Sequence, residues 1–579
     1  MKTTYHHIRC FLKALLLTAL PLGGVGGGLV SCSDFLNPTS ELVEFEEDNT
    51  LNHSTDSVYS VLGILNTMQR IADRTVLLGE VRSDLVSVTD AATTDLKRLA
   101  AFDFSQANKY NEVSDYYAVI NNCNYYLAHV DINLERRGRK LFEQEYAVVK
   151  AYRAWTYLQL VTTYGEVPLV TTPVMTEQEA TDAMNLPRKG IAEVCDYFIN
   201  DLTPYAWTFL ADFGSVAGWD SQNFFIPIRA LLGDLCLWAG RYTDAARWYN
   251  SYLNDEKSPV LLNIASRIQW TDPTEFNYPS NGYFTTSTSE VISFIPMESL
   301  PFYGVVSDLP NVFNSTRDNK YYFQLTPSVG MRQLSAAQTY CLKHDNSAGS
   351  KVDTVYVPKT GMKEDLLVGD LRLYACFSQS SRGGQDPYSD ESSLGQLITK
   401  VWRGAGVPIY RITMVYLRYA EALNRAGFPQ SAMAVLKYGL CPENNALYID
   451  PREQAKAGSL IDFDANIFRA TTTIGIHSRG SGDSDINDSL ALPKPPTALP
   501  TFEDSVNYQI PLVEDMIINE MALEGSFEGY RFYDLMRVAL RRGDNAYLAD
   551  PISRRDGTAD ATVRSKLMDK KNWYLPLPQ

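Results

Sequence analysis

The chain has 579 residues, 45% of them hydrophobic and 21% charged, and a formal net charge of −16. Its length could hold three or four domains or one large body, and its acidic balance argues against nucleic-acid binding, which needs a basic surface. After residue 31 no run approaches the roughly 18 uninterrupted apolar residues that a membrane-spanning helix requires.

Residues 1–31 have the layout of a signal peptide, because three cations and no acidic residue accompany an apolar run at residues 14–22. That run is too short to span a bilayer. Leu29 then stands three residues before Cys32, and the small residue Ser31 precedes the thiol. This pattern resembles the lipobox of bacterial lipoproteins; the alternative is an ordinary secretory signal. We expect acylation of Cys32, and two or three acyl chains would hold the protein firmly to a membrane.

The segment after the lipobox is acidic. Residues 33–49 carry six carboxylates and few strong structure formers. We interpret residues 32–50 as an acylated, solvated tether. Without the three cations of the leader, 49 Lys and Arg face 68 Asp and Glu, so the remaining chain has a formal charge of −19.

Long amphipathic helices dominate the rest of the chain. Between Tyr146 and Tyr164 large apolar side chains recur at helical spacing, and Gly165 follows as a stop signal. A further helical stretch is predicted at residues 516–542.

Two segments have the pattern of tetratricopeptide-like helix hairpins. In the first, Gly240 lies between two helical runs and Ala245 follows five residues later. Gly427 and Ala432 repeat this offset. Glycine permits the tight turn, and alanine lets the second helix approach the first.

These patterns predict a mainly α protein, with a tetratricopeptide-like helical repeat scaffold and a loop-rich insertion that contains short strands. Strand-like runs such as residues 290–295 are brief, and Pro, Gly, Ser, Thr and Asn are frequent around them. We expect a single body at 51–579, made of helical repeats at about 51–253, 401–445 and 510–545, the insertion at about 254–400 and an irregular segment at about 446–509.

Most signatures of catalysis and metal binding are missing from the sequence. The histidines after the leader form no pair at metal-ligand spacing, and neither a Gly-x-Ser-x-Gly elbow nor a phosphate-binding glycine loop is present. Residues 483–488 begin like a calcium loop, but Asp488 and Lys494 stand where the turn glycine and the bidentate acid belong. We therefore expect no metal and no cofactor. The six widely spaced cysteines after Cys32 are interpreted as buried thiols.

Charged residues near the C-terminus could form a charged helix face, a buried structural network or a catalytic carboxylate pair. They lie at helical offsets, and we favour the structural interpretation because such ion-pair networks are frequent in scaffolds. A glycosidase pair remains an alternative. The residues are Glu524, Glu528, Arg531, Asp534 and Arg537.

Several stretches together resemble the SusD/RagB family of outer-membrane nutrient-binding lipoproteins from Bacteroidetes. Residues 151–169 are similar to the family's "RAYYYFDLVRLYGDVPL" stretch, and residues 524–537 to its "ElafEGqRwfDLrR" motif. The sequence departs from the family at Asn519-Glu520, where Glu-Arg is usual. Further similar segments, in the family's order, are 121–124, 369–373, 410–424 and 574–579.

The resemblance implies a surface-exposed protein, lipid-anchored in the outer membrane, and a SusC-like TonB-dependent transporter as its partner. It also implies an α-helical body with the ligand site in the loop-rich region. The leading hypothesis is a non-catalytic protein that captures an oligosaccharide and passes it to the transporter. Capture of peptides, hydrolysis by a carboxylate pair, and a repeat scaffold that binds only proteins remain as alternatives.

Candidate ligand-binding residues are aromatics in polar stretches that contain glycine or proline. Sugar rings pack their C–H faces on flat aromatic rings. The alternative for each residue is a place in the core. The candidates are Trp270, Tyr278, Tyr283, Tyr303 and Tyr321 in the insertion, and Tyr110 in the N-terminal polar loop.

Overall fold

A computed structural model provides the structure of the chain. It describes residues 56–577 except 217, 257, 263–289, 298–303, 314–323, 338–339, 346–351, 358–369, 371, 374–375, 380–395, 399, 401–405 and 482–489. The signal peptide, Cys32, the acidic tether and the calcium-like loop therefore lie outside the described residues.

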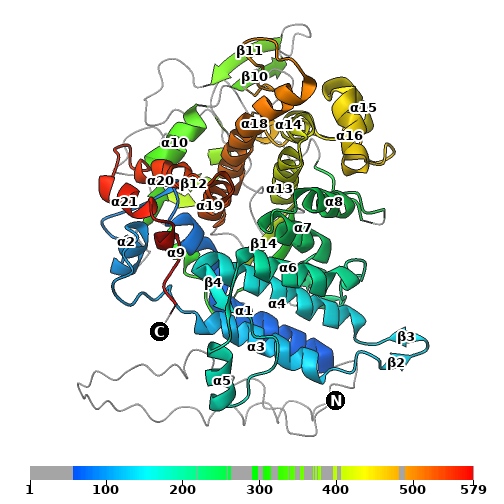
Figure 1. The fold of residues 1–579 in the computed structure, drawn as a ribbon, viewed down its shortest axis with the longest axis vertical. Helices are drawn as coiled ribbons and strands as arrows, with labels where there is room; N and C mark the ends of the chain where they lie inside the picture. The colour runs from blue at the N-terminus through cyan, green and yellow to red at the C-terminus, as the bar shows by residue number, and fades with distance from the viewer. Residues whose placement is uncertain are drawn as a thin grey trace, which may run out of the picture.

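The body is a curved array of α-helices in which successive helices pack on one another (Figure 1). The array runs from the lower helices α1, α3 and α4 through α6, α7 and α8 to α13, α14 and α18. This order confirms the mainly α, tetratricopeptide-like scaffold. The bounds are α1 (Asp56–Glu80), α3 (Ser114–His129), α4 (Glu143–Tyr164), α6 (Ile191–Leu202), α7 (Ile228–Trp238), α8 (Tyr242–Leu253), α13 (Ile412–Arg425), α14 (Pro429–Lys437), α18 (Phe502–Gly525) and α19 (Arg531–Arg542).

Shorter elements complete the described fold. The short helices are α2 (Thr94–Ala100), α5 (Glu177–Met184), α9 (Leu309–Val312), α10 (Val329–Ala336), α15 (Pro442–Tyr448), α16 (Pro451–Ala457), α17 (Ser478–Ser481), α20 (Ala546–Ser553) and α21 (Ala561–Leu567). The strands form antiparallel pairs: β1 (Val86–Val88) with β9 (Leu325–Pro327), β2 (Glu135–Arg136) with β3 (Arg139–Lys140), β4 (Glu166–Pro168) with β5 (Arg188–Gly190), β6 (Ser215–Val216) with β7 (Trp219–Asp220), β8 (Val291–Pro296) with β14 (Gly406–Arg411), β10 (Tyr340–Asp345) with β11 (Val352–Val357), and β12 (Phe377–Gln379) with β13 (Gln396–Ile398).

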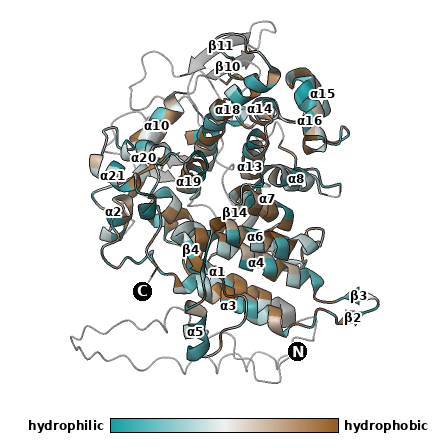
Figure 2. Cartoon of the chain, viewed as in Figure 1, coloured by the Kyte–Doolittle hydropathy of each residue, from teal (hydrophilic) through white to brown (hydrophobic). Residues whose placement is uncertain are grey.

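Helix α4 forms part of the centre of the core. The predicted apolar positions Val148, Tyr152 and Trp155 are all buried, and the helix ends at Gly165, whose φ is +82°. Figure 2 shows hydrophobic residues gathered where the lower helices lie against one another. The predicted helix and its stop signal are confirmed.

Both predicted hairpins are present. Gly240 (φ +76°) joins α7 to α8, and Gly427 (φ +99°) joins α13 to α14. Ala245 and Ala432 are fully buried, which permits the close approach of the paired helices.

A strand inside the insertion pairs with the strand that directly follows the insertion. Strand β8 lies within the insertion, β14 begins a few residues after its end, and the two pair antiparallel from Gly406 opposite Pro296 to Arg411 opposite Val291. The short strand expected at residues 290–295 is thus confirmed, and it fixes the insertion to the helical body.

The helical stretch predicted at residues 516–542 is present and consists of two helices. Helix α18 starts earlier, at Phe502, and ends at Gly525, while α19 starts at Arg531. The turn between them contains two left-handed residues, Phe527 (φ +65°) and Gly529 (φ +89°). The turn lies directly against α1, so a tertiary contact interrupts the helix.

No helix in the described part of the chain is long and apolar enough to cross a membrane. Five of the cysteines, at positions 123, 195, 236, 376 and 441, are free and buried, as predicted.

The close contact between α1 and the turn predicts that Gly529→Ala destabilises the protein. A Cβ at this position would lie 2.1 Å from the carbonyl oxygen of Thr75, and the positive φ would add strain. We expect a loss of at least about 3 kcal/mol in the free energy of unfolding, measured by denaturant titration. The matched control is Gly543→Ala, where φ is +64° but a Cβ meets no atom within 4 Å; it should cost about 1 kcal/mol. Equal losses in the two variants would contradict the packing argument.

Candidate functional site

The five aromatic candidates of the insertion, at positions 270, 278, 283, 303 and 321, lie outside the described residues. Their predicted contact with a ligand therefore stays a prediction. The described structure shows what holds the ends of the insertion and where the described body is hollowed.

The sixth candidate, Tyr110, is a buried residue with 7% of its surface exposed. Its ring packs in the hydrophobic core, and the Lys109 ammonium lies 4.9 Å from the ring centroid. This placement favours the core alternative, because little of the ring is available for stacking on a sugar. Its assignment to the ligand site stays a prediction.

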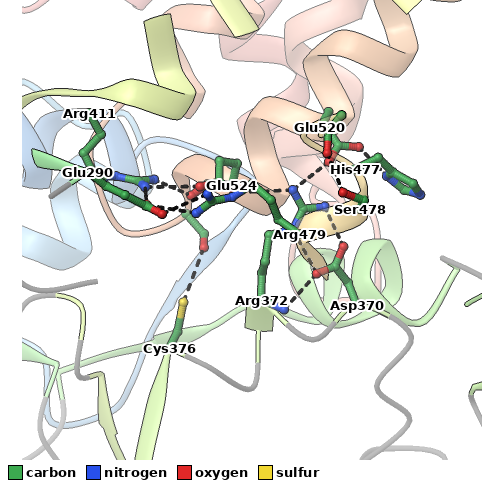
Figure 3. Close-up of polar contacts among 12 residues, drawn as sticks. Glu290, Asp370, Arg372, Cys376, Arg411, His477, Ser478, Arg479, Glu520 and Glu524 are labelled. Carbon is green, nitrogen blue, oxygen red and sulfur yellow. Dashed lines mark hydrogen bonds and ion pairs between the residues drawn. The ribbon is translucent and has the colours of Figure 1, made fainter. Parts of the chain in front are cut away.

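The base of the insertion is built on a buried ion-pair network centred on Glu524 of α18 (Figure 3). One carboxylate oxygen accepts from Arg411 at 3.1 Å, and the other accepts from Arg372 and Arg479, both at 3.3 Å. All four side chains are nearly or fully buried. Four segments far apart in the sequence therefore meet at one carboxylate.

Each arginine of this network has a second acidic partner. Arg372 holds Asp370 at 2.6 Å, Arg479 contacts both oxygens of Glu290 at 2.9 Å, and Arg411 holds Glu528 at 2.7 Å. In each pair two guanidinium nitrogens donate to the two oxygens of one carboxylate, the bidentate contact that suits these groups.

The network also includes Glu520, Lys400 and His477. Glu520 lies 2.6 Å from Arg372, and its other oxygen lies 2.7 Å from Nδ1 of His477. Lys400 contacts Glu528 at 2.5 Å and donates to the backbone carbonyl of Glu524 at 2.7 Å. Glu520, where the sequence departs from the family pattern, is thus part of the buried network of the scaffold.

Burial and charge act against each other in this network. Burial alone would raise the pKa of Glu520, but attraction by Arg372 and His477 outweighs it and lowers the pKa to about 2. The pKa of Glu524 is likewise lowered, because its three arginines outweigh the cost of burial. The pKa of Glu528 is lowered for the same reason by Arg411 and Lys400.

The other charged residues of the C-terminal motif are also structural. Arg531 of α19 donates to both carboxylate oxygens of Asp84, at 2.7 and 2.8 Å. Arg537 joins Asp534 at 2.8 Å to Glu421 of α13. The interpretation of this motif as a buried structural network is confirmed by these contacts.

The arrangement is poorly suited to glycoside hydrolysis. A general acid needs a raised pKa, whereas Glu524 and Glu528 have lowered pKa values and are held by cations. Burial raises the pKa of Glu80 to about 8, but Glu80 does not line any of the three hollows described below. No group of three or more potential metal ligands occurs among the described residues.

Three hollows differ sharply in size. Two lie inside the body beside Glu528, with volumes of about 40 and 60 Å³, which is room for water and not for a sugar. The third has a volume of about 760 Å³, within the range of small-molecule sites, and we call it the C-terminal hollow. Its wall is formed by the end of α4, strands β4 and β5 and the 3-10 helix η9 (Lys570–Trp573), and includes Phe104, Tyr164, Glu166, Arg188, Lys570, Lys571 and Tyr574.

The wall of the C-terminal hollow is preformed. Trp573 is fully buried, donates to the carbonyl of Leu567 at 2.7 Å, and accepts from the guanidinium of Arg82 at 2.8 Å through its backbone carbonyl. The next residue, Tyr574, packs against Gly165, where a Cβ would lie 2.9 Å from the ring. These contacts hold this part of the wall in place.

Sequence reasoning missed both the partners of Glu524 and the C-terminal hollow. Arg479 stands in a Gly- and Ser-rich segment that we read as irregular surface, and nothing local distinguishes it. For the hollow, a local signal exists in the pair Lys570-Lys571 before the terminal motif. That pair alone does not indicate that Arg188 lies near it.

The network predicts that Glu524→Gln destabilises the protein strongly. The substitution leaves three buried arginines with less negative charge, and breaking such a network typically costs about 3–5 kcal/mol. The measurement is denaturant unfolding followed by circular dichroism. The control is Glu503→Gln, which removes an exposed partner of Lys456 and should leave the unfolding midpoint nearly unchanged. A midpoint for Glu524→Gln close to that of the control would contradict the proposed role of the network.

Comparisons with known proteins add to this geometry. No protein-family model and no curated protein matches the sequence. A solved SusD superfamily protein from Bacteroides thetaiotaomicron is 15% identical, with a TM-score of 0.54 over 88% of this chain and 92% of that one. A SusD-like protein from Bacteroides fragilis is 17% identical, with a TM-score of 0.53 over 87% and 89% of the two chains. A SusD-like carbohydrate binding protein from Bacteroides vulgatus is 15% identical, with a TM-score of 0.52 over 84% of each chain.

At these identities the likeness is one of fold. It extends over most of each chain, and it agrees with the ordered motifs from residue 121 to the C-terminus. The resemblance inferred from the sequence is therefore confirmed, and the chain has the fold of the SusD superfamily.

Proposed function

We propose that this protein is a cell-surface glycan-binding lipoprotein that delivers oligosaccharide to a SusC-type TonB-dependent transporter. The observation that carries the proposal is the fold shared with a SusD-like carbohydrate binding protein over 84% of both chains. The lipobox at Cys32 and the weakness of the catalytic alternatives agree with a role in capture.

The binding site is proposed to lie in the insertion. Its polar stretches supply both flat aromatic rings and hydrogen-bonding side chains, which sugars require. The pairing of β8 with β14 and the network around Glu524 give this region a rigid base. The aromatics proposed as contacts are Trp270, Tyr278, Tyr283, Tyr303 and Tyr321.

Two other functions remain weaker proposals. Capture of cationic peptides would suit the acidic surface, but the C-terminal hollow, the ligand-sized one of the three described above, carries more cations than acids. Hydrolysis would need a pair of carboxylates free to exchange protons, and Glu524 and Glu528 are instead held by buried cations. We therefore place glycan capture first.

The proposed site predicts that single alanine substitutions of Trp270, Tyr283 and Tyr303 weaken glycan binding. A stacked ring contributes about 0.5–1.5 kcal/mol beyond burial, which corresponds to about a twofold to tenfold change in affinity. Affinity is measured by calorimetry with an oligosaccharide that binds the unmodified protein, and thermal unfolding is measured beside it. Trp207→Ala, which removes an exposed ring of the helical body (68% exposed), is the matched control. Unchanged affinity in all three folded variants would move the site out of the insertion.

Lipid anchoring predicts that Cys32→Ala moves the protein from the membrane fraction to the soluble fraction. The substitution removes the acceptor thiol, and no helix in the described part of the chain is long and apolar enough to replace it. The measurement is fractionation after a high-salt wash, with thermal unfolding as a check on folding. Cys123→Ala is a control that should stay with the membrane. Retention of the Cys32 variant in the membrane fraction would refute the anchor.

The transporter partner is proposed from the resemblance alone. Repeat hairpins often bind partners on an extended face, and a stable complex would bury well over about 1,000 Å². The repeats and the insertion can therefore serve different partners in one protein.

A further inference from the structure

The C-terminal hollow has an unusual balance of charge for this protein. The chain has 68 acidic and 52 basic residues, yet the hollow is lined by three cations, Arg188, Lys570 and Lys571, and one acid, Glu166. All four are exposed to solvent. The hollow is thus a cationic pocket in an acidic molecule.

These three cations have no partner in the described structure. No hydrogen bond or ion pair forms from the side chains of Arg188, Lys570 and Lys571 to any described residue. This contrasts with the arginines of the core: Arg411 holds three carboxylates and Arg479 holds two. Three unpaired cations on one ligand-sized hollow suit an anionic ligand.

The cations come from two different elements of the wall, and both elements are held by hydrogen bonds. Arg188 belongs to β5, which is paired with β4. The lysines belong to η9, which is anchored through the buried Trp573. Between them the chain after η9 is fixed to α4, because the amide of Leu575 donates to the carbonyl of Thr163 at 3.0 Å. The spacing of the charges is therefore set by the fold.

The hollow also contains surfaces that suit a sugar ring. Phe104 and Tyr574 line it and are partly exposed. Tyr164 lines it as well, with 5% of its surface exposed. A sugar could pack its C–H faces on the exposed parts of Phe104 and Tyr574.

We propose that the C-terminal hollow is a binding site for an acidic sugar, with Arg188, Lys570 and Lys571 holding a carboxylate or sulfate group of the glycan. This site is separate from the one proposed in the insertion, and it rests on the proposed function only in taking a glycan as the ligand. It defines a substrate class: oligosaccharides that carry negative charge.

The test compares pairs of probes that share a sugar backbone and differ chiefly in charge. Tri-galacturonate and its methyl ester share one backbone, and only the free acid carries carboxylates. A sulfated galactan oligosaccharide and its desulfated form make the second pair, which distinguishes sulfate from carboxylate. Calorimetry with the unmodified protein should show tighter binding of at least one charged probe than of its neutral form. That difference should fall as NaCl rises from 50 to 500 mM, because salt screens exposed charges.

Substitutions in the wall then test whether the charged probe binds in the hollow. Lys570→Ala combined with Lys571→Ala should weaken its binding about fivefold or more, whereas Glu166→Gln should strengthen it about twofold by removing a repulsive charge. The control, Lys494→Ala, removes an exposed lysine outside the hollow and should leave the affinity unchanged. The same variants should not alter binding of a neutral oligosaccharide.

Three results would overturn the site. The first is equal affinity for the charged and neutral forms of both pairs. The second is that the double variant and Lys494→Ala change the affinity equally. The third is that an acidic peptide such as hexaglutamate binds as tightly as the charged sugar. A failure of the insertion variants to alter neutral-glycan binding would instead count against the proposed function. The two failures are therefore distinguishable.

Discussion

Glu524 is a fully buried carboxylate that contacts three arginines from three separate parts of the chain. Removing four charged groups from water is costly, and only mutual attraction with good geometry offsets that cost. Each arginine therefore needs a second acidic partner. Each of these acids must lie in a segment that the fold places beside Glu524. The positions of β8, β14, α17 and α18 relative to one another depend on this requirement.

The network joins two parts of the protein with different architecture. On one side is the helical array, whose hairpins turn at Gly240 and Gly427 and whose faces are closed by apolar packing. On the other is the insertion, whose strand β8 pairs with β14 directly before α13. A rigid base lets a loop-rich region vary its ligand contacts without disturbing the scaffold. This division agrees with capture at the loops and docking along the repeats.

Local signals predicted the helical elements well, and the tertiary features poorly. The stop at Gly165 and both hairpin turns follow from glycine at the end of periodic apolar runs. The break between α18 and α19 was missed because its cause is the packing of Gly529 against α1, about 450 residues away along the chain.

The acids and arginines of the C-terminal motif were correctly interpreted as structural, but their partners were not found. Arg372 and Arg411 are 152 and 113 residues from Glu524, and no local pattern links them. The C-terminal hollow was missed for the same reason, since its cations come from β5 and η9.

The central claim is that the protein binds glycan without cleaving it. Calorimetric titration of the purified protein against a panel of oligosaccharides and a panel of peptides, with chromatography of each mixture after incubation, tests this claim most directly. The account predicts saturable binding of at least one oligosaccharide, no saturable binding of peptides, and recovery of the bound sugar at its original length. Saturable binding of peptides alone, or release of shorter sugars from a bound oligosaccharide, would contradict it.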